Sequence, residues 1–546
     1  KGMTYGGSLI RPEATGFGAV YFLRQMLEKA GMDIKGQTIA ISGFGNVAWG
    51  AATKATELGA KVVTLSDSSG YIHDPEGISP EKLEYVMELK NVFRGRIKEY
   101  ADRYPEATYY AGQRPWGVKC DIAMPCATQN ELDGEDAKRL LANGVKVIVK
   151  PTTYKADEVR MSAVAKGGLS ILSDEEFYMG EMMPAFNSMS GVGKFSATDL
   201  KKQLSGKSAS VQPSVENYAS EMNGFCSPKD LETMFQLLYL NFTQPRFDEN
   251  DYNTLMKMLR AQLENVKSNP DYLMEDKFID VVYGNNPRRQ MVSTEIIDKF
   301  SFEALPAIYK KLYPDANSFV FKFVGNVDLE TLKPLVEKYI GSLPTSKKPM
   351  TFVDDKCAPV KGEVTEDFTA SMQQPKVSVR YRFSGEMPYT LKNKAALTFL
   401  TQALNSRYLI SIREEKGGTY GVQVSGSTEY IPSETYDMTI SFDTNEEMAD
   451  ELREIVMKEI EEIAANGPKS EDIEKHREFM LKSWKNSLEQ NGAWMNYIQI
   501  KYGSGLNYIA DHEQAIRDLT NADVQALAKK ILADGNLVKV VMRPSK

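Results

Sequence analysis

Histidine is scarce in this chain, and that scarcity excludes one kind of site. The sequence contains three histidines, and neither H-x-x-E-H nor H-E-x-x-H occurs in it. A catalytic zinc ion needs about three protein ligands gathered at one point, and histidine is prominent in such sets. His476 lies in a charged stretch typical of a solvated helix face, and His512 has no partner at ligand spacing. We therefore predict no metal site and no zinc in this chain.

Cysteine pairs, long apolar runs and excess positive charge are also missing. The four cysteines form no C-x-x-C pair, which favours free buried thiols in a reducing compartment. No apolar run approaches the roughly 20 residues of a membrane-spanning helix, and the N-terminus lacks the apolar core of a signal peptide. A net charge of −8 argues against a nucleic acid or an anionic membrane as partner. The sequence as written predicts a cytoplasmic protein.

What the sequence does contain is enough material for several domains. With 546 residues, 42% of them hydrophobic, the chain is too long for one core and predicts roughly three or four domains. Its pattern changes at a short β-branched run, residues 143–150 (Asn-Gly-Val-Lys-Val-Ile-Val-Lys). The sequence before this run and the sequence after it predict different folds.

The first part has a strand, a glycine-rich turn and a helix in the order that binds dinucleotides. Residues 37–42 form an apolar run, a G-x-G-x-x-A sequence follows at 43–48, and a helical stretch leads to a second strand at 61–65. Gly43 permits a tight turn and Gly45 lets the backbone approach a pyrophosphate, which the helix N-terminus would bind. The expected cofactor contacts in this turn are Gly43, Gly45, Asn46 and Val47.

Residues after the second strand bear on the choice between NAD and NADP. Asp67 would accept hydrogen bonds from the ribose hydroxyls of NAD, whereas hydroxyl side chains and cations suit a 2′-phosphate. Serines flank Asp67, and three basic residues at 90–96 would supply cations unless they form a solvated helix face. The candidate cofactor residues of both kinds are Ser66, Asp67, Ser68, Ser69 and Lys90.

Three segments of this part, in order over roughly 140 residues, resemble the hexameric glutamate dehydrogenase family. They are residues 6–16 (Gly-Gly-Ser-Leu-Ile-Arg-Pro-Glu-Ala-Thr-Gly), the turn at 43–48, and residues 125–132 (Pro-Cys-Ala-Thr-Gln-Asn-Glu-Leu). The Ser-Asp-Ser-Ser sequence at 66–69 resembles the NADP-preferring members. Weak binding of NADP is therefore the cofactor prediction.

The resemblance also implies which residues contact the cofactor and that part of the family's active site lies outside this segment. It places Thr15, Ala127 and Asn130 near the nicotinamide and residues 66–69 near the adenosine ribose. The family's substrate-binding and catalytic lysines and its aspartate lie in a domain N-terminal to this segment, and its return segment follows the strand near residue 148. Hydride transfer needs the amino acid held against the nicotinamide in a closed cleft. We therefore expect cofactor binding without oxidation of glutamate.

The second part contains an internal repeat. A helix at 302–312 and a strand at 317–321 are echoed by a helix at 522–531 and a strand at 536–540. Each copy runs strand, helices and strands over about 190–200 residues, which is a normal domain size. A polar stretch at 346–362 is expected to link the copies.

Two stretches of this part resemble the C-terminal half of an insulinase/pitrilysin-type zinc peptidase. The first is residues 191–204, which open with Gly-Val-Gly-Lys-Phe-Ser, together with residues 227–232 (Ser-Pro-Lys-Asp-Leu-Glu). The second is residues 405–422, which end with Arg-Glu-Glu-Lys-Gly-Gly-Thr-Tyr-Gly-Val at 413–422. The resemblance implies that Arg413 and Tyr420 are catalytic, reaching into the zinc site of the other half to contact the substrate backbone and the oxyanion. Without it, both would be loop residues beside a glycine turn. It implies a zinc-bearing N-terminal half or subunit and a peptide substrate as partners, and an exported parent is compatible with it.

Together these features predict an α/β Rossmann-like parallel sheet followed by two repeated α+β domains with mostly antiparallel sheets. The expected divisions are residues 1–143 for the nucleotide-binding domain, 144–345 for the non-zinc peptidase copy, 346–362 for the linker and 363–546 for the C-terminal copy with the Arg/Tyr loop.

Three functions are consistent with this organisation. The leading hypothesis is a fusion of two enzyme fragments, an NADP-dependent glutamate dehydrogenase and a zinc metallopeptidase, that is inactive alone. The second is a non-catalytic subunit that pairs with a separate zinc-bearing peptidase subunit. The third is an NADP-binding regulatory module on a peptidase-like scaffold.

The run at the change of pattern suits either neighbour. Val145, Val147 and Val149 share one face of a strand, and Lys146 and Lys150 share the other. A strand in a parallel sheet is buried on both faces, and burying two unpaired lysines is costly. We therefore expect a half-exposed, antiparallel strand in the peptidase-like sheet, with the dehydrogenase sheet one strand short.

Overall fold

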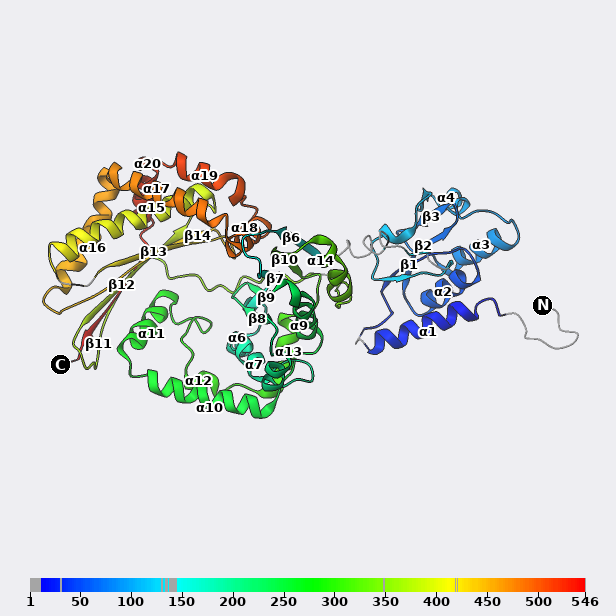
Figure 1. Cartoon of the computed structure of the whole chain (residues 1–546), viewed down its shortest axis with the longest axis horizontal. Helices are drawn as coiled ribbons and strands as arrows, with labels where there is room; N and C mark the ends of the chain where they lie inside the picture. The colour runs from blue at the N-terminus through cyan, green and yellow to red at the C-terminus, as the bar shows by residue number, and fades with distance from the viewer. Residues whose placement is uncertain are drawn as a thin grey trace, which may run out of the picture. The chain divides into compact units, whose positions relative to one another are not determined.

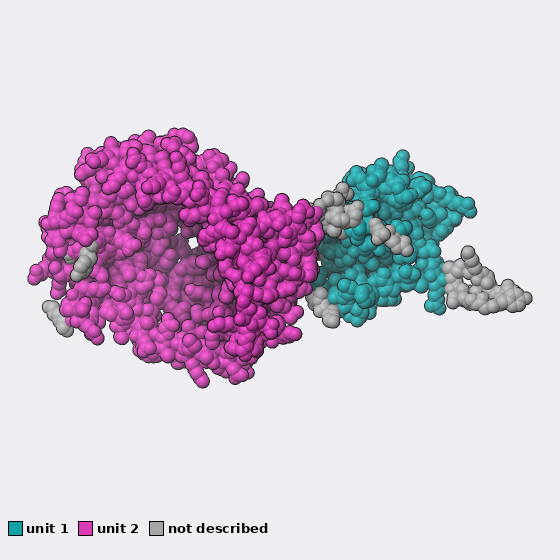
Figure 2. Space-filling model, in the orientation of Figure 1, with its two compact units in different colours: residues 1–145 teal, residues 146–546 magenta. Residues whose placement is uncertain are grey.

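The chain folds into two compact units, residues 1–145 (unit 1) and residues 146–546 (unit 2), which Figure 2 shows in different colours. Each unit has its own sheets and hydrophobic core. No helix among the described residues is long and apolar enough to cross a membrane. The structure is a computed structural model that describes residues 11–29, 32–128, 131–132, 136, 145–346, 349–417, 419 and 421–545.

Unit 1 alternates strands and helices. The apolar run before the glycine turn forms its first strand, and the alanine-rich stretch after the turn forms a helix whose buried face is alanine and glycine, which lets it pack close to its neighbours. The elements are α1 (Ala14–Lys29), β1 (Thr38–Ile41), α2 (Asn46–Glu57), β2 (Lys61–Asp67), β3 (Gly70–His73), α3 (Pro80–Asn91), α4 (Lys98–Arg103), β4 (Thr108–Ala111) and β5 (Ile122–Met124).

The sheet of unit 1 is mixed, with the strand order β4-β3-β2-β1-β5. Figure 1 labels its three middle strands, β1, β2 and β3. β1 runs parallel to β2 and β5, whereas β3 is antiparallel to β2 and β4. β4 therefore runs in the same direction as β1, β2 and β5, and the prediction of a parallel sheet is wrong for β3 alone. The reason is the short connection, because the turn between Asp67 and Gly70 suffices for a hairpin but not for the crossover that a parallel neighbour needs.

Unit 2 contains two five-stranded sheets that repeat one topology. In each copy the first and last strands pair parallel and every other pair is antiparallel. The internal repeat and the mostly antiparallel sheets predicted from the sequence are confirmed. The first sheet consists of β6 (Lys146–Pro151), β10 (Phe319–Gly325), β7 (Val159–Lys166), β9 (Ala219–Cys226) and β8 (Ala209–Val215) in that order, and the second of β11 (Glu363–Ala370), β15 (Leu537–Pro544), β12 (Val377–Glu386), β14 (Thr435–Thr444) and β13 (Gln423–Glu429).

Helices of unit 2 follow the same repeat, so that α10 and α11 of the first copy correspond to α17 and α18 of the second. The first copy contains α6 (Asp174–Glu181), α7 (Met183–Ser190), α8 (Ala197–Gln203), α9 (Leu231–Thr243), α10 (Glu249–Val266), α11 (Pro270–Tyr283), α12 (Thr294–Ile297), α13 (Leu305–Leu312) and α14 (Leu329–Leu335). The second contains α15 (Leu391–Tyr408), α16 (Ala449–Asn466), α17 (Ser470–Ser487), α18 (Asn491–Ser504), α19 (Tyr508–Asp518) and α20 (Asn521–Asp534).

One helix of each copy packs on the sheet of the other copy. α11 covers the second sheet, where its Met274 and Phe278 share an apolar core with β11 and β15. α18 packs on the first sheet, and polar side chains meet there. The Asn491 side chain accepts from the Thr152 hydroxyl at 2.6 Å and donates to Glu158 at 3.0 Å. The two copies therefore bury parts of one another and form one unit.

The run expected to serve either neighbour, residues 146–151, is β6 and pairs with β10 of unit 2. The prediction that it joins the peptidase-like sheet is confirmed. The expectation of an antiparallel strand is wrong, because β6 runs parallel to β10. It is an edge strand with exposed or half-buried residues throughout, and Lys150 keeps its ammonium 4.3 Å over the ring of Trp494. An edge strand can carry two lysines on one face because neither is fully buried.

The stretch expected as a linker is fastened to the first copy. Asp355, whose side chain has no exposed surface, accepts a hydrogen bond from the Tyr218 hydroxyl at 2.6 Å and pairs with Arg289 at 3.3 Å. A buried carboxylate held by a cation and a phenol fixes the stretch in place.

Candidate functional site

The glycine turn of unit 1 has the geometry that its sequence pattern predicts. Gly43 has a φ of +100°, a conformation that strains residues with a side chain. A Cβ at Gly43 would also lie 2.9 Å from the carbonyl oxygen of Cys126, so the position has no room for one. The buried Ser66 fixes the turn, because its Oγ accepts the Gly43 amide at 2.8 Å.

This turn opens onto the N-terminus of α2. The exposed Gly45 is the residue before α2 and has no side chain to cap it, so the first amides of the helix keep their capacity to bind an anion. On α1, a Cβ at Gly16 would lie 2.4 Å from the carbonyl oxygen of Val47, so the two helices cross closely there. Gly16, the neighbour of Thr15, thus packs against the first turns of α2, and Thr15 itself is exposed.

The segment after β5 is held beside the turn by a glutamate. Glu131 accepts a hydrogen bond from the Ser42 hydroxyl and another from the Ala127 amide at 2.8 Å. Ser42 Oγ in turn accepts the Cys126 amide at 2.9 Å. The exposed Ala127 therefore lies next to the glycine turn, while Asn130, the other residue predicted near the nicotinamide, lies outside the described residues.

Asp67, which would favour NAD, has both carboxylate oxygens engaged by the protein. Oδ1 accepts the amide and the hydroxyl of Ser69 at 2.7 and 2.6 Å, and Oδ2 accepts the Ile97 amide at 3.0 Å. Burial alone would raise the pKa of Asp67, but these hydrogen bonds and the charge of Arg96 outweigh it and lower the pKa. The side chain is only 7% exposed, so Asp67 and Ser69 stabilise the turn between β2 and β3.

Two cations lie at the same end of the sheet. Arg96 donates to the Ser68 hydroxyl at 3.0 Å, and its side chain is 65% exposed. Lys90 has its ammonium 5.0 Å over the ring of Phe44, the second residue of the glycine turn. A hydroxyl and two exposed cations form a set that suits a phosphate.

In unit 2, the predicted substrate loop begins with a widened helical turn directly after α15. Arg413 is exposed in that turn, which spans Leu409–Glu414. Gly417, three residues after Glu414, has a φ of +65° and lets the chain reverse. Tyr420, the second residue predicted to be catalytic, lies outside the described residues.

Hydrogen bonds join the two ends of this loop, a feature that the sequence did not predict. The Asn405 side-chain amide accepts from the Val424 amide at 2.9 Å and donates to its carbonyl at 3.0 Å. Lys416 also pairs with Glu451 of α16 at 2.5 Å. Nothing in the sequence marks Asn405 for this role, because its partner is backbone rather than a complementary side chain.

The histidines of unit 2 are involved in packing contacts. His476 is half-buried against α15, where its Nε2 lies 3.3 Å from the Ser406 hydroxyl, so its predicted place on a solvated face is wrong. His512 stacks on Tyr508, with ring centroids 4.7 Å apart, and burial lowers its pKa to about 4. No group of three or more His, Cys, Asp or Glu residues able to hold a metal occurs within the described part of the chain.

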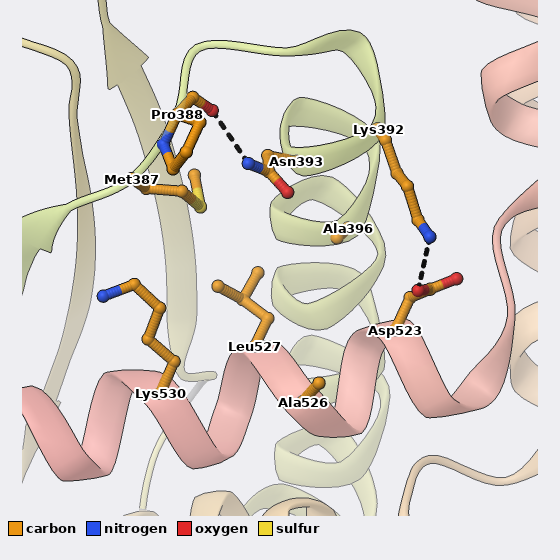
Figure 3. Close-up of a pocket in the computed structure, with 9 residues that line it drawn as sticks. All are labelled: Met387, Pro388, Lys392, Asn393, Ala396, Asp523, Ala526, Leu527 and Lys530. Atoms are coloured by element: carbon orange, nitrogen blue, oxygen red, sulfur yellow. Dashed lines mark hydrogen bonds and ion pairs between the residues drawn. The ribbon is translucent and has the colours of Figure 1, made fainter.

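A separate pocket of about 340 Å³ lies between the start of α15 and α20 (Figure 3). Lys392 pairs across it with Asp523 at 2.7 Å, and Lys530 pairs with Asp534 at 2.8 Å. Its charged groups are thus already neutralised, and none of the predicted site residues lines it.

Two family models match different parts of this chain. Residues 6–163 match the model of Glutamate/Leucine/Phenylalanine/Valine dehydrogenase, and residues 299–480 match the Peptidase M16 inactive domain. Both resemblances drawn from the sequence are confirmed. The chain has a two-part architecture in which a dehydrogenase-family segment precedes an M16 inactive-domain segment.

Curated relatives of the first part are glutamate dehydrogenases. The NAD-specific enzyme of Bacteroides fragilis is 66% identical over 145 residues, which are 27% of this chain and 33% of that protein. The NADP-specific enzyme of Haemophilus influenzae is 52% identical over 167 residues, 30% of this chain and 37% of that protein. This chain therefore spans about a third of the length of the curated relatives it matches.

Solved structures similar to the chain are largely peptidases. The periplasmic protease PqqL from Escherichia coli is 15% identical with a TM-score of 0.65, and the match covers 97% of this chain and 60% of that one. The peptidase M16 inactive domain from Pseudomonas fluorescens is 17% identical with a TM-score of 0.62, and the match covers 74% of this chain and 97% of that one. At such identities the likeness establishes the fold alone.

The dehydrogenase match extends beyond unit 1. It ends at residue 163, so it includes β6 and the first half of β7, both of which pair with β10 in unit 2. The strand that the sequence predicted for either neighbour thus belongs to one part by sequence similarity and to the other by hydrogen bonding.

Proposed function

We propose that this chain joins a cofactor-binding fragment of a glutamate dehydrogenase to the non-zinc, substrate-holding half of an insulinase-type metallopeptidase. Alone it catalyses neither parent reaction. The observation that supports the first half best is the glycine turn at 43–48, which leads into the uncapped N-terminus of α2. Gly16 of α1 packs against the first turns of that helix, and hydrogen bonds hold the segment of Ala127 beside the turn. Backbone amides and a helix dipole at one exposed point suit a pyrophosphate.

Within this proposal, unit 1 binds NADP weakly and in preference to NAD. The relatives' names include both NAD-specific and NADP-specific enzymes, so local chemistry must decide. A ribose diol needs free carboxylate oxygens, and those of Asp67 already accept from Ser69 and Ile97. A 2′-phosphate needs donors and positive charge, which Ser68 and Arg96 supply.

Calorimetric titration of the whole chain with NADP and with NAD tests the preference. Ser68→Asp should weaken NADP binding by about tenfold or more, because a carboxylate would neutralise Arg96 and repel the phosphate. Ser68→Ala is the matched control and should lose much less. Ser69→Asp should also shrink the preference, although it sets a second carboxylate against Asp67. Tighter binding of NAD than of NADP by the parent chain would refute the assignment.

A second function rests on unit 2, which we propose to pair with a separate zinc-bearing peptidase subunit and to hold its peptide substrate. Arg413 supports this proposal, since it is exposed at the start of a loop whose ends Asn405 and Val424 clasp together. An exposed cation on such a loop can stabilise an oxyanion formed on a partner's metal site.

Mixing the whole chain with a zinc-bearing N-terminal half of the same family tests this pairing. Proteolysis of a peptide should appear, and Arg413→Ala or Tyr420→Phe should lower turnover by about a hundredfold, the usual effect of losing one transition-state donor. Arg517→Ala, which removes a cation that pairs with Glu513 on α19, is the control and should keep full turnover. Full activity of both loop variants would show that the loop has no catalytic role.

A further inference from the structure

The two sheets of unit 2 have four edge strands, and three of them are protected against pairing with another chain. A bare edge presents unpaired N–H and C=O groups to any extended segment, and lysine, proline or charge at the edge prevents this. β6 carries two lysines and ends on Pro151, and β8 contains Pro213. β11 carries three acidic residues, of which Glu363 and Asp367 pair with cations of β15.

β13 is the exception. Its sequence, Gln-Val-Ser-Gly-Ser-Thr-Glu, contains no lysine, arginine or proline, and its one charge is on the last residue, Glu429. It pairs with β14 on one side and is the last strand of its sheet. Ser425, Gly426 and Ser427 are exposed, so the middle of this edge is accessible and free of bulky side chains.

Contacts of Asn405 reveal which backbone groups of β13 face outward. Its side-chain amide bonds to both the N–H and the C=O of Val424, as a residue of a neighbouring strand would. Outward and inward residues alternate along an antiparallel strand, so Gly426 and Thr428 also direct their N–H and C=O groups away from β14. Within the described part of the chain, no hydrogen bond to these outward groups is present besides those at Val424.

We propose that β13 is a docking edge for an extended peptide, which adds a strand through main-chain hydrogen bonds to Gly426 and Thr428. The Asn405 side chain already makes the two hydrogen bonds to Val424, so the peptide cannot pair there. Asn405 therefore sets one end of the added strand. The peptide is the expected occupant because β13 directly follows the loop that carries Arg413, so a chain lying along this edge would pass that loop. This assignment of the substrate's binding mode rests on the peptide-holding function proposed above.

The probe is a fluorescein-labelled peptide of nine residues that alternates threonine and valine, with lysine at each end. Binding to the whole chain is followed by fluorescence anisotropy. Two further peptides carry N-methyl groups on alternate residues, one set for each edge of the peptide strand. One methylated peptide should bind at least about tenfold more weakly than the parent, because it has lost the donors that face β13. The other should bind within about twofold of the parent, because its methyl groups face solvent.

Residue-resolved hydrogen exchange with the parent peptide then locates the site. The amides of Gly426 and Thr428 should become slower to exchange, whereas those of Ser425 and Ser427, already bonded to β14, should not change. Equal binding of the two methylated peptides, no binding of the parent peptide, or protection elsewhere would overturn the proposal. Dimerisation of the chain with protection of Gly426 and Thr428 before any peptide is added would also overturn it, because the occupant would then be a second copy. None of these measurements uses a zinc-bearing half, so their outcome is independent of whether mixing restores proteolysis.

Discussion

Lys322 is a buried lysine in the middle of strand β10, and its replacement should stabilise unit 2. Its side chain is 1% exposed beneath α18, where its ammonium donates to the Gln499 side-chain oxygen. Its ladder neighbours, Ile148 on β6 and Ser162 on β7, do not titrate, and Glu221 on β9 is the carboxylate that attracts it. The corresponding face of the second sheet is filled by apolar residues of β15. An apolar side chain should therefore fit at this position.

The size of the effect follows from the pKa of Lys322. Burial lowers it from 10.5 to about 8, an effect that Glu221 only partly offsets. A difference of about 2.5 pKa units corresponds to about 3 kcal/mol of destabilisation at pH 7. Because the unfolded chain binds more protons between pH 8 and 10.5, the stability of the parent should rise with pH across that window. The penalty should shrink to about 1 kcal/mol at pH 10.

The variant should combine Lys322→Met with Gln499→Leu. Lys322→Met alone would leave the Gln499 oxygen without its donor, at a cost of about 1–3 kcal/mol. We expect the double variant to be about 2–3 kcal/mol more stable than the parent at pH 7 and about 1 kcal/mol more stable at pH 10. Urea unfolding of the whole chain, followed by hydrogen exchange in β10, measures both. A double variant that is less stable at pH 7, or a gain independent of pH, would refute the reasoning.

Three further predictions concern the turn, the shared strand and the metal. Gly43→Ala should abolish NADP binding and lower the melting temperature of unit 1, because residue 43 has a φ of +100° and its Cβ would lie 2.9 Å from the Cys126 carbonyl oxygen. In the control Gly45→Ala the new Cβ meets nothing within 4 Å, so the melting temperature should not change. Equal melting temperatures of the two variants would contradict this. Hydrogen exchange in β6 should be slow and in step with β10, and β1 should exchange faster; protection of β6 that instead follows β1 and rises with NADP would assign the strand to the dehydrogenase part. Elemental analysis of the purified chain should find no stoichiometric zinc. About one zinc ion per chain that is lost when a histidine is mutated would contradict this prediction.

Features that depend on local chemistry could be read from the sequence alone. The turn at Gly43 was predictable because its φ and its lack of space follow from residues within a few positions and from one glycine. The choice of sheet for residues 146–151 was predictable because two lysines on one face disfavour a strand that is buried on both faces. The repeat was predictable because both copies bury the same pattern of helices and strands.

Other features needed partners from distant parts of the chain, and only the tertiary structure decided them. Asp67 looked free to bind a ribose, yet one of its donors is the amide of Ile97, thirty residues away. The antiparallel β3, the exchange of α11 and α18 between copies, and the clasp between Asn405 and Val424 likewise depend on which surfaces meet. Sequence patterns state how much of a side chain must be buried or bonded, but the fold determines which group supplies the contact.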